Sequence, residues 1–296
     1  MPPPLARRRF LQLCVGGLLG ASACGDGSGE RGDVAGDAGV PAPERRAYGD
    51  HDQAFGDLWL PDGATGPVPV VVLVHGGFWG AGFGLDLMDG LAASVAAAGW
   101  AAWNVEYRRL GSGGGYPETF DDVAAAVDHL ADVEAPLDLD RVAIVGHSAG
   151  GQLAAWAASR PSLPPEAPRS APAVVPSLVV PQAGVLDLVD CAATGLGGSA
   201  CPELVGGRPD DVPERYAWTS PLALVPPAAT VLAVHGTADD IVPLAQSERY
   251  VEAVAAAGGA AELRAVPGAD HFDVIDPEHG SWRLVLDALA AELDAR

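Results

Sequence analysis

The sequence predicts an α/β fold with a mostly parallel central sheet and helices on both faces of the sheet. Short apolar runs rich in Val, Leu and Ile alternate with longer Ala-rich stretches from about residue 48 onward, which is the pattern of strands joined by helices. The run Val68–Val74 is apolar throughout, as expected of a strand that is covered on both faces. A chain of 296 residues, 49% of them hydrophobic, can bury such a sheet within one domain.

Each expected element follows from its own local pattern. Apolar runs that end at turn residues predict strands, and Ala-rich stretches with apolar residues at helical spacing predict helices. The expected strands are 54–60, 68–74, 100–107, 142–145, 177–185, 230–234 and 261–266. The expected helices are 85–98, 117–130, one that starts near residue 149, and 284–293. The Pro-rich stretch 161–176 and the stretch 188–229 are expected to be irregular.

The composition excludes one class of partner. The chain holds 39 acidic and 17 basic residues, for a formal net charge of −22. A surface of this sign repels the phosphates of nucleic acid. The sequence also has no paired His and Asp cluster at metal-ligand spacing, so we expect neither a metal nor another cofactor.

The N-terminus predicts an export signal rather than a folded element. Arg7, Arg8 and Arg9 precede an apolar run that ends at Ala23 and is too short to span a bilayer. Paired arginines before Phe-Leu resemble a twin-arginine signal. Two outcomes stay open: simple cleavage after Ala23, or acylation of Cys24 in a lipoprotein box that would anchor the protein to a membrane.

The expected organisation is therefore an export signal, a linker and one folded domain. Residues 1–23 are the signal, and residues 24–46 are rich in Gly, Asp, Ser, Ala and Pro. Such a segment cannot bury enough apolar surface to fold, so it predicts a flexible tether. The domain is expected to occupy residues 47–296, outside the cytoplasm. There, in an oxidising compartment, Cys191 and Cys201 are expected to form a disulfide.

The central motif is Gly146-His147-Ser148-Ala149-Gly150, a G-x-S-x-G pentapeptide between an apolar strand and an Ala-rich helix. A serine on such a sharp strand-to-helix turn has its hydroxyl exposed above the sheet, on a strained backbone. Glycines two residues before and after are needed because a Cβ there would collide with the neighbouring strand and helix. The alternative is a helix N-terminus that Ser148 merely caps.

Three further loops follow expected strands. The first, His75-Gly76-Gly77-Phe78-Trp79-Gly80, is rich in glycine, so it exposes backbone N–H groups that can receive a developing oxyanion. The others contain Asp239 with Asp240, and Asp270-His271-Phe272-Asp273. Loops at the carboxyl ends of parallel strands meet at one edge of the sheet, where they can combine into one site.

The four motifs GHSAGG, HGTADDIVP, DHFD and HGGFW together resemble the α/β-hydrolase fold, and they cover about residues 50–290. Serine, aspartate and histidine occur in the chain order of an α/β-hydrolase triad. The resemblance is strongest to kynurenine formamidase-like and to feruloyl or acetyl esterase-like proteins, which are related to hormone-sensitive lipase. Kynurenine formamidases act inside cells, so the export signal departs from that pattern.

The chemistry of the triad assigns roles to these side chains. Ser148 is a poor nucleophile until a base takes its proton, and His271 is the expected base. Asp239 matches the family position of the acid that orients the histidine, with Asp240 as the rival acid and His279 as the rival base. The resemblance implies that the N–H groups of residues 77, 78 and 149 (Gly77, Phe78 and Ala149) form the oxyanion hole.

Three functions remain open at this level. The first is an exported serine carboxylesterase acting on short acyl or aryl esters. The second is a formamidase or small peptidase that uses the same triad. The third is a non-catalytic binding protein on a hydrolase scaffold, which is disfavoured because every triad position is filled. The sequence does not specify the acyl or alcohol group of the substrate, nor the oligomeric state.

Overall fold

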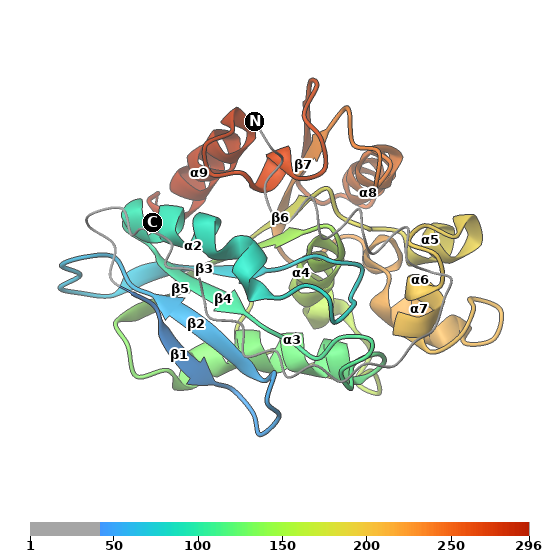
Figure 1. The fold of residues 1–296 in the computed structure, drawn as a ribbon, viewed down its shortest axis with the longest axis horizontal. Coiled ribbons are helices and arrows are strands. Elements are labelled where there is room, and N and C mark those ends of the chain that lie inside the picture. Colours follow the sequence, from blue (N-terminus) through green and yellow to red (C-terminus); the bar gives the residue numbers. More distant parts are fainter. Residues whose placement is uncertain (1–41, 296) are drawn as a thin grey trace, which may run out of the picture.

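The computed structural model of this chain describes residues 42–295, so the predicted export signal, Cys24 and most of the predicted tether lie outside the described residues. The described part contains an eight-stranded sheet in the order β1-β2-β4-β3-β5-β6-β7-β8 (Figure 1). Strands β3 to β8 pair in parallel, whereas β2 is antiparallel to both β4 and β1. The strands are β1 (Glu44–Ala47), β2 (Phe55–Trp59), β3 (Val68–Val74), β4 (Ala101–Val105), β5 (Leu137–His147), β6 (Leu178–Gln182), β7 (Thr230–Gly236) and β8 (Ala261–Val266).

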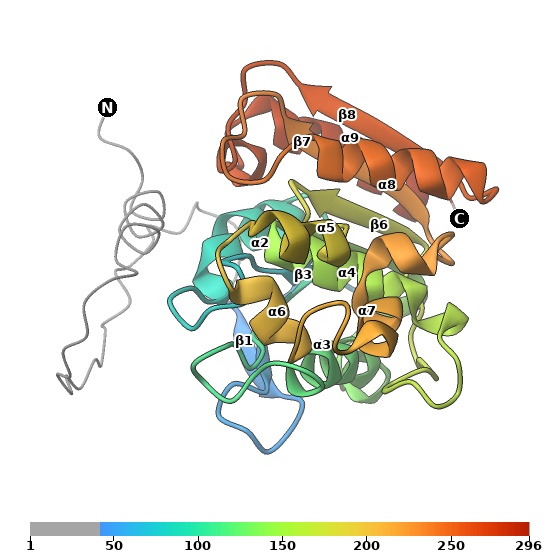
Figure 2. The same cartoon turned by 90° about the vertical axis from the view of Figure 1, so that its right-hand side faces the viewer.

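Helices cover both faces of this sheet, as predicted. The helices are α2 (Asp89–Ala97), α3 (Glu118–Asp128), α4 (Ala149–Ser159), α5 (Leu188–Thr194), α6 (Ala200–Val205), α7 (Pro213–Thr219), α8 (Ala245–Ala256) and α9 (Gly280–Leu293). One apolar cluster joins the sheet to α2 and α9, and a second joins its other face to α3, α4 and α8. Helices α5, α6 and α7 lie together beside α3 and α4 (Figure 2). No helix within residues 42–295 has both the length and the apolar character required to cross a bilayer.

The central strands explain why the apolar runs fold as they do. Residues Val70 to Val74 of β3 are fully buried, because β4 and β5 flank the strand and helices cover both of its faces. β-branched side chains pack well on a pleated surface that is buried on both sides. The predicted strands 68–74 and 261–266 match β3 and β8 residue for residue.

Several expected elements differ from the structure. Strand β1 starts at Glu44, inside the predicted tether, and pairs with β2; Arg45 and Asp57 on these strands also form an ion pair, with nitrogen and oxygen 2.7 Å apart. Strand β5 is longer than the expected 142–145, β6 is shorter than 177–185, and α9 begins before residue 284. The stretch expected to be irregular after β6 instead folds into α5, α6 and α7, which have six or seven residues each, too few for a helical period to show, and α8 was also not expected.

The predicted disulfide is wrong, because Cys191 and Cys201 are both free and buried. They lie on α5 and α6, where each thiol donates to a backbone carbonyl: Cys191 Sγ to Leu196 O at 3.4 Å and Cys201 Sγ to Leu188 O at 3.2 Å. The neighbouring Cys201 thiol, together with burial, raises the pKa of the Cys191 thiol. The prediction assumed an exposed loop, whereas the two cysteines belong to the packed interior between short helices.

Candidate active site

Ser148 lies on the turn between β5 and α4, on a strained backbone with φ 55° and ψ −118°. A non-glycine residue rarely adopts positive φ, and such strain is typical of functional positions. The flanking glycines permit the turn: a Cβ on Gly146 would collide with the carbonyl of Gly150, and a Cβ on Gly150 would collide with the carbonyls that follow β3. The expectation of an exposed hydroxyl is wrong, because the Ser148 side chain is buried; its Oγ has no hydrogen-bond partner within the described part of the chain.

Asp239 and His271 meet above the ends of β7 and β8. His271 Nδ1 lies 2.7 Å from Asp239 Oδ2, and both side chains are buried. The backbone N–H groups of Ile241 and Val242 donate to Asp239 Oδ1 at 2.9 Å each. Burial alone would raise the pKa of Asp239, but the hydrogen bonds from His235 and His271 outweigh it and hold this pKa well below its ordinary value. An ionised Asp239 therefore accepts the Nδ1 proton of His271 and makes Nε2 the basic nitrogen.

His147 joins the loop after β8 to the turn that carries the serine. Its Nε2 donates to the backbone carbonyl of His271 at 2.9 Å, and the two imidazole rings are 4.6 Å apart between centroids. Because His147 directly precedes Ser148 in the chain, this contact places His271 beside the serine. Burial and the neighbouring His271 lower the pKa of His147 to about 3, so His147 is neutral at physiological pH.

The rival residues lie in other environments. Asp240 is exposed, whereas its neighbour Asp239 bonds to His271. His279 is the N-cap of α9, where its Nδ1 accepts from the backbone N–H of Ser281 at 3.2 Å. Asp270 Oδ1 accepts from the backbone N–H groups of the two residues after His271, so it shapes the loop. The structure pairs Asp239 with His271 beside the turn that carries Ser148, and it leaves the rivals apart.

The glycine-rich loop after β3 lies against the serine turn. A Cβ on Gly76 would approach Ser148 Cβ to 3.0 Å. Three consecutive residues of the loop have positive φ: Gly77 at 112°, Phe78 at 48° and Trp79 at 56°. Trp79 Nε1 donates to Gln152 Oε1 on α4 at 3.0 Å, which ties the loop to the helix behind the serine.

The predicted oxyanion donors belong to two segments that lie against each other at the serine turn. Ala149 is the first residue of α4, and the first N–H groups of a helix have no partner within the helix. The helix dipole favours negative charge at that position. Gly77 and Phe78 belong to the strained loop that lies against the same turn. Backbone N–H groups from two segments can therefore converge on an oxygen bound at Ser148.

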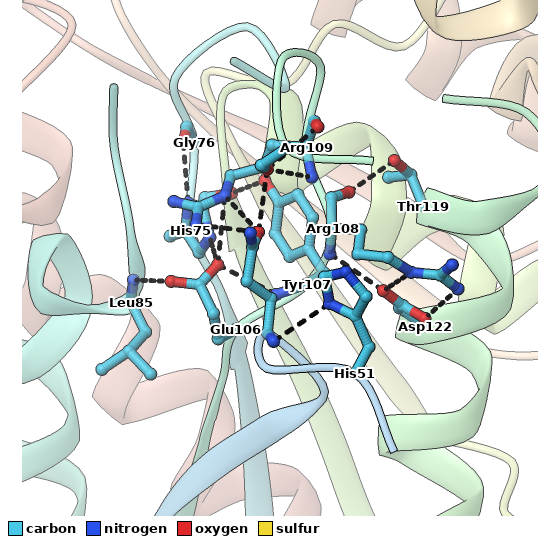
Figure 3. A network of polar contacts seen from close by, with 12 residues as sticks. His51, His75, Gly76, Leu85, Glu106, Tyr107, Arg108, Arg109, Thr119 and Asp122 are labelled. Carbon is cyan, nitrogen blue, oxygen red and sulfur yellow. Dashed lines mark hydrogen bonds and ion pairs between the residues drawn. The ribbon is translucent and has the colours of Figure 1, made fainter. Parts of the chain in front are cut away.

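A polar network supports the loop from behind (Figure 3). Glu106, just after β4, accepts from the backbone N–H of Tyr107 at 2.9 Å and from that of Leu85 at 3.2 Å. Its Oε1 also lies 2.9 Å from His75 Nε2. Through these contacts His75 supports the loop. Sequence reasoning did not identify Glu106 or Gln152; Glu106 is the one acidic residue within the expected strand 100–107, which was the available signal.

The α5–α6 segment lies over the glycine-rich loop. Gly197 has φ 70°, and a Cβ on it would come within 2.5 Å of the Phe78 ring. Glycine is thus required both by the backbone and by the close approach of the ring. The segment that we predicted to be irregular therefore contributes to the cover of the site.

A separate hollow of about 610 Å³ lies at the opposite edge of the sheet. Its lining includes Leu178, Thr230 and Ala261, the first residues of β6, β7 and β8. The loops with Ser148, Asp239 and His271 follow the carboxyl ends of their strands. This hollow is therefore not the site formed by those three residues.

The fold and the site define an α/β-hydrolase: a serine on a strained strand-to-helix turn, with an aspartate–histidine pair from the loops after β7 and β8. A model of the BD-FAE family matches residues 56–254, and the chain belongs to that family. Within residues 42–295 no group of three or more His, Cys, Asp or Glu is arranged to hold a metal ion.

Two curated relatives are esterases of Mycobacterium tuberculosis. Esterase LipC is 30% identical over 255 residues, which is 78% of this chain and 60% of the relative. Esterase LipQ is 30% identical over 260 residues, which is 79% of this chain and 60% of the relative. The chain thus spans about 60% of the length of these relatives.

Solved structures show the same fold. A truncated carbohydrate esterase from gut microbiota superposes with a TM-score of 0.72 at 20% identity, covering 86% of this chain and 96% of the other. A bacterial heroin esterase superposes with a TM-score of 0.68 at 23% identity, covering 87% of this chain and 84% of the other. At these identities the likeness concerns the fold alone.

Proposed function

We propose that this chain is a serine carboxylesterase that cleaves short acyl or aryl esters through an acyl-enzyme on Ser148. The observation that carries the proposal is the 2.7 Å contact between His271 Nδ1 and Asp239 Oδ2, held beside the strained serine turn. The names of the relatives LipC and LipQ, both called esterases, support the same chemistry.

The reaction follows from the roles of these groups. His271 Nε2 takes the proton of Ser148 Oγ as the oxygen attacks the ester carbonyl carbon. The carbonyl oxygen becomes an oxyanion, which the N–H groups of residues 77, 78 and 149 stabilise. The intermediate collapses when His271 returns the proton to the leaving alcohol, and an acyl ester remains on the serine. A water molecule, deprotonated by His271, then releases the acid and restores the enzyme. Asp239 stays ionised and stabilises the imidazolium at each step.

The experiment compares wild type and Ser148→Ala on a panel of nitrophenyl esters of increasing acyl length, with acetylated xylan, feruloyl esters and N-formylkynurenine as further substrates. We expect the variant to lose at least about 10³-fold in turnover while its fold survives. A fluorophosphonate should label Ser148 in the wild type. Labelling at another residue, or near-normal turnover by the variant, would refute the mechanism. Preference for N-formylkynurenine over every ester would assign the formamidase instead.

We also propose that the protein is exported and that its N-terminal segment is processed. The twin arginines, the short apolar run that ends at Ala23, and Cys24 support this proposal. Intact mass of the mature protein distinguishes cleavage after Ala23 from acylation of Cys24. An unprocessed chain that remains in the cytoplasm would contradict export.

A further inference from the structure

His75 occupies a buried position in which both of its ring nitrogens face oxygen atoms that only accept hydrogen bonds. Its Nδ1 lies 2.8 Å from the backbone carbonyl oxygen of Gly76, and its Nε2 lies 2.9 Å from Glu106 Oε1 (Figure 3). A carbonyl oxygen has no proton to give, and an ionised carboxylate has none either. Both nitrogens must therefore donate, which requires a proton on each of them.

The alternative is a protonated Glu106 that donates to a neutral ring, and the surroundings of this carboxyl oppose it. The backbone N–H of Tyr107 donates to Oε1 at 2.9 Å, the N–H of Leu85 donates to Oε2 at 3.2 Å, and Arg109 Nε lies 3.4 Å from Oε1. Burial favours the neutral acid, but the two backbone N–H donors and Arg109 stabilise the ionised carboxylate without any contribution from His75. Glu106 is thus an acceptor at neutral pH.

Two other buried histidines, His147 and His235, differ from His75 in their hydrogen-bond partners. His147 Nε2 donates to a carbonyl, while its Nδ1 has no partner within the described part of the chain. His235 Nε2 lies 2.9 Å from Val242 O and 3.2 Å from Asp239 Oδ2, and its Nδ1 can accept from Ser247 Oγ at 2.8 Å. A neutral ring with one N–H accounts for the contacts of each of these two residues. Only His75, of the three, faces at both nitrogens an oxygen that has no proton to donate.

We propose that His75 is an imidazolium at neutral pH and that it orients and polarises the Gly76–Gly77 peptide at the oxyanion hole. The Gly76 carbonyl accepts the Nδ1 proton, and in a trans peptide the C=O and the following N–H point in opposite directions. The bond therefore directs the Gly77 N–H away from His75. A charged donor on the carbonyl also makes the N–H of the same peptide a stronger donor. His75 is a positioning residue in this scheme, which rests on the proposed esterase function.

The charges around His75 are consistent with a cation. The loop after β4 supplies Glu106, Tyr107 and Arg109, of which Arg109 also faces Glu106. The Tyr107 ring stacks on the imidazole with centroids 4.3 Å apart and planes 12° apart, an arrangement that favours a positive ring. The serine turn supplies His147, which is neutral. A further acidic side chain, Asp86, lies near Gly84 together with Glu106.

Nitrogen NMR of the ¹⁵N-histidine-labelled protein measures the protonation state directly. The chain has seven histidines, and the spectrum of His75→Gln identifies the His75 signals by their loss. We expect both ring nitrogens of His75 to show the shifts of an imidazolium at pH 7 and 8. In Glu106→Gln, where the compensating charge is gone but the amide can still hydrogen-bond, we expect a neutral His75. A neutral His75 in the wild type would overturn the proposal.

Kinetics on the best ester test the consequence for the oxyanion hole. We expect Glu106→Gln to lower kcat by about 10-fold and His75→Gln by about 10- to 100-fold, with KM changed less than about twofold, because a weakened oxyanion donor acts mainly in the transition state. His129→Gln, a partly buried histidine outside the site, is the matched control and should retain wild-type kcat. Equal kcat for folded Glu106→Gln and wild type would refute the polarising role.

The two readouts separate this inference from the proposed function. The NMR measurement on the wild type needs no activity and no variant beyond the one used for assignment. If no ester is hydrolysed but His75 is an imidazolium, the protonation state stands and the esterase proposal fails. If esters are hydrolysed and His75 is neutral, the esterase stands and this inference fails.

Discussion

His147 makes the stability of this protein sensitive to mild acid. The side chain is fully buried between the serine turn and the loop after β8, where its Nε2 donates to His271 O. Burial and the neighbouring His271 lower the pKa of His147 from the ordinary 6.5 to about 3. In the unfolded chain the same imidazole is exposed and takes up a proton near pH 6.5. Between these two values the unfolded state binds a proton that the folded state does not.

The magnitude follows from linkage. Stability falls with falling pH wherever the unfolded state binds more protons, by about 1.4 kcal/mol per pH unit for one proton. Between pH 7 and pH 5 the His147 contribution amounts to a loss of about 2 kcal/mol in the free energy of unfolding. Because pH 5 lies well above the pKa of His147 in the folded state, the size of this loss depends almost entirely on the pKa of the same side chain in the unfolded state.

The assay is urea unfolding of wild type and His147→Gln at pH 7, 6 and 5. Glutamine does not titrate, and its amide can donate to His271 O as the imidazole does. We expect the variant to be less stable than wild type at pH 7 and the difference between the two to change by about 2 kcal/mol in favour of the variant by pH 5. The carboxylates titrate in both proteins and cancel in the comparison. If the two stabilities fall in parallel from pH 7 to pH 5, the folded protein accepts a proton at His147 and the reasoning is wrong.

Two further predictions concern the triad and the serine turn. Asp239→Asn should lower kcat on the best ester by about 10³- to 10⁴-fold, because an amide orients the wrong tautomer of His271. The same change at the exposed Asp240 should leave kcat nearly unchanged. A large loss of kcat in Asp240→Asn and a small loss in Asp239→Asn would instead identify Asp240 as the acid. Gly150→Ala should cost at least about 3 kcal/mol in urea unfolding, because the added Cβ runs into backbone carbonyls that cannot move away. Gly280→Ala is its control, since a Cβ at this helix start meets no atom within 4 Å. Equal stabilities of the two alanine variants would mean that the turn relaxes.

Local pattern was sufficient for the central strand β3 and for the edge strand β8, which were both predicted with their observed bounds. Strand β3 is covered on both faces and is apolar throughout, whereas β8 lies at the edge of the sheet and alternates apolar with charged residues. The order of strands and helices then placed the loops with Ser148, Asp239 and His271 at one edge of the sheet. For this reason the contact between Asp239 and His271 agrees with the pairing of acid and base expected from the motifs, while the catalytic role of Ser148 stays a prediction.

What the sequence did not reveal depends on contacts between segments far apart in the chain. Cys191 and Cys201 lie in a stretch with weak periodicity, and only the packing of α5 against α6 shows that both thiols are interior and hydrogen-bonded. Glu106 is one acid among 39 in the sequence, and its role appears only when β4 lies next to β3 and brings it to His75. Local sequence determines which segments are apolar and where turns fall, whereas the protonation state of a buried histidine depends on which oxygen atoms the tertiary structure places beside its two nitrogens.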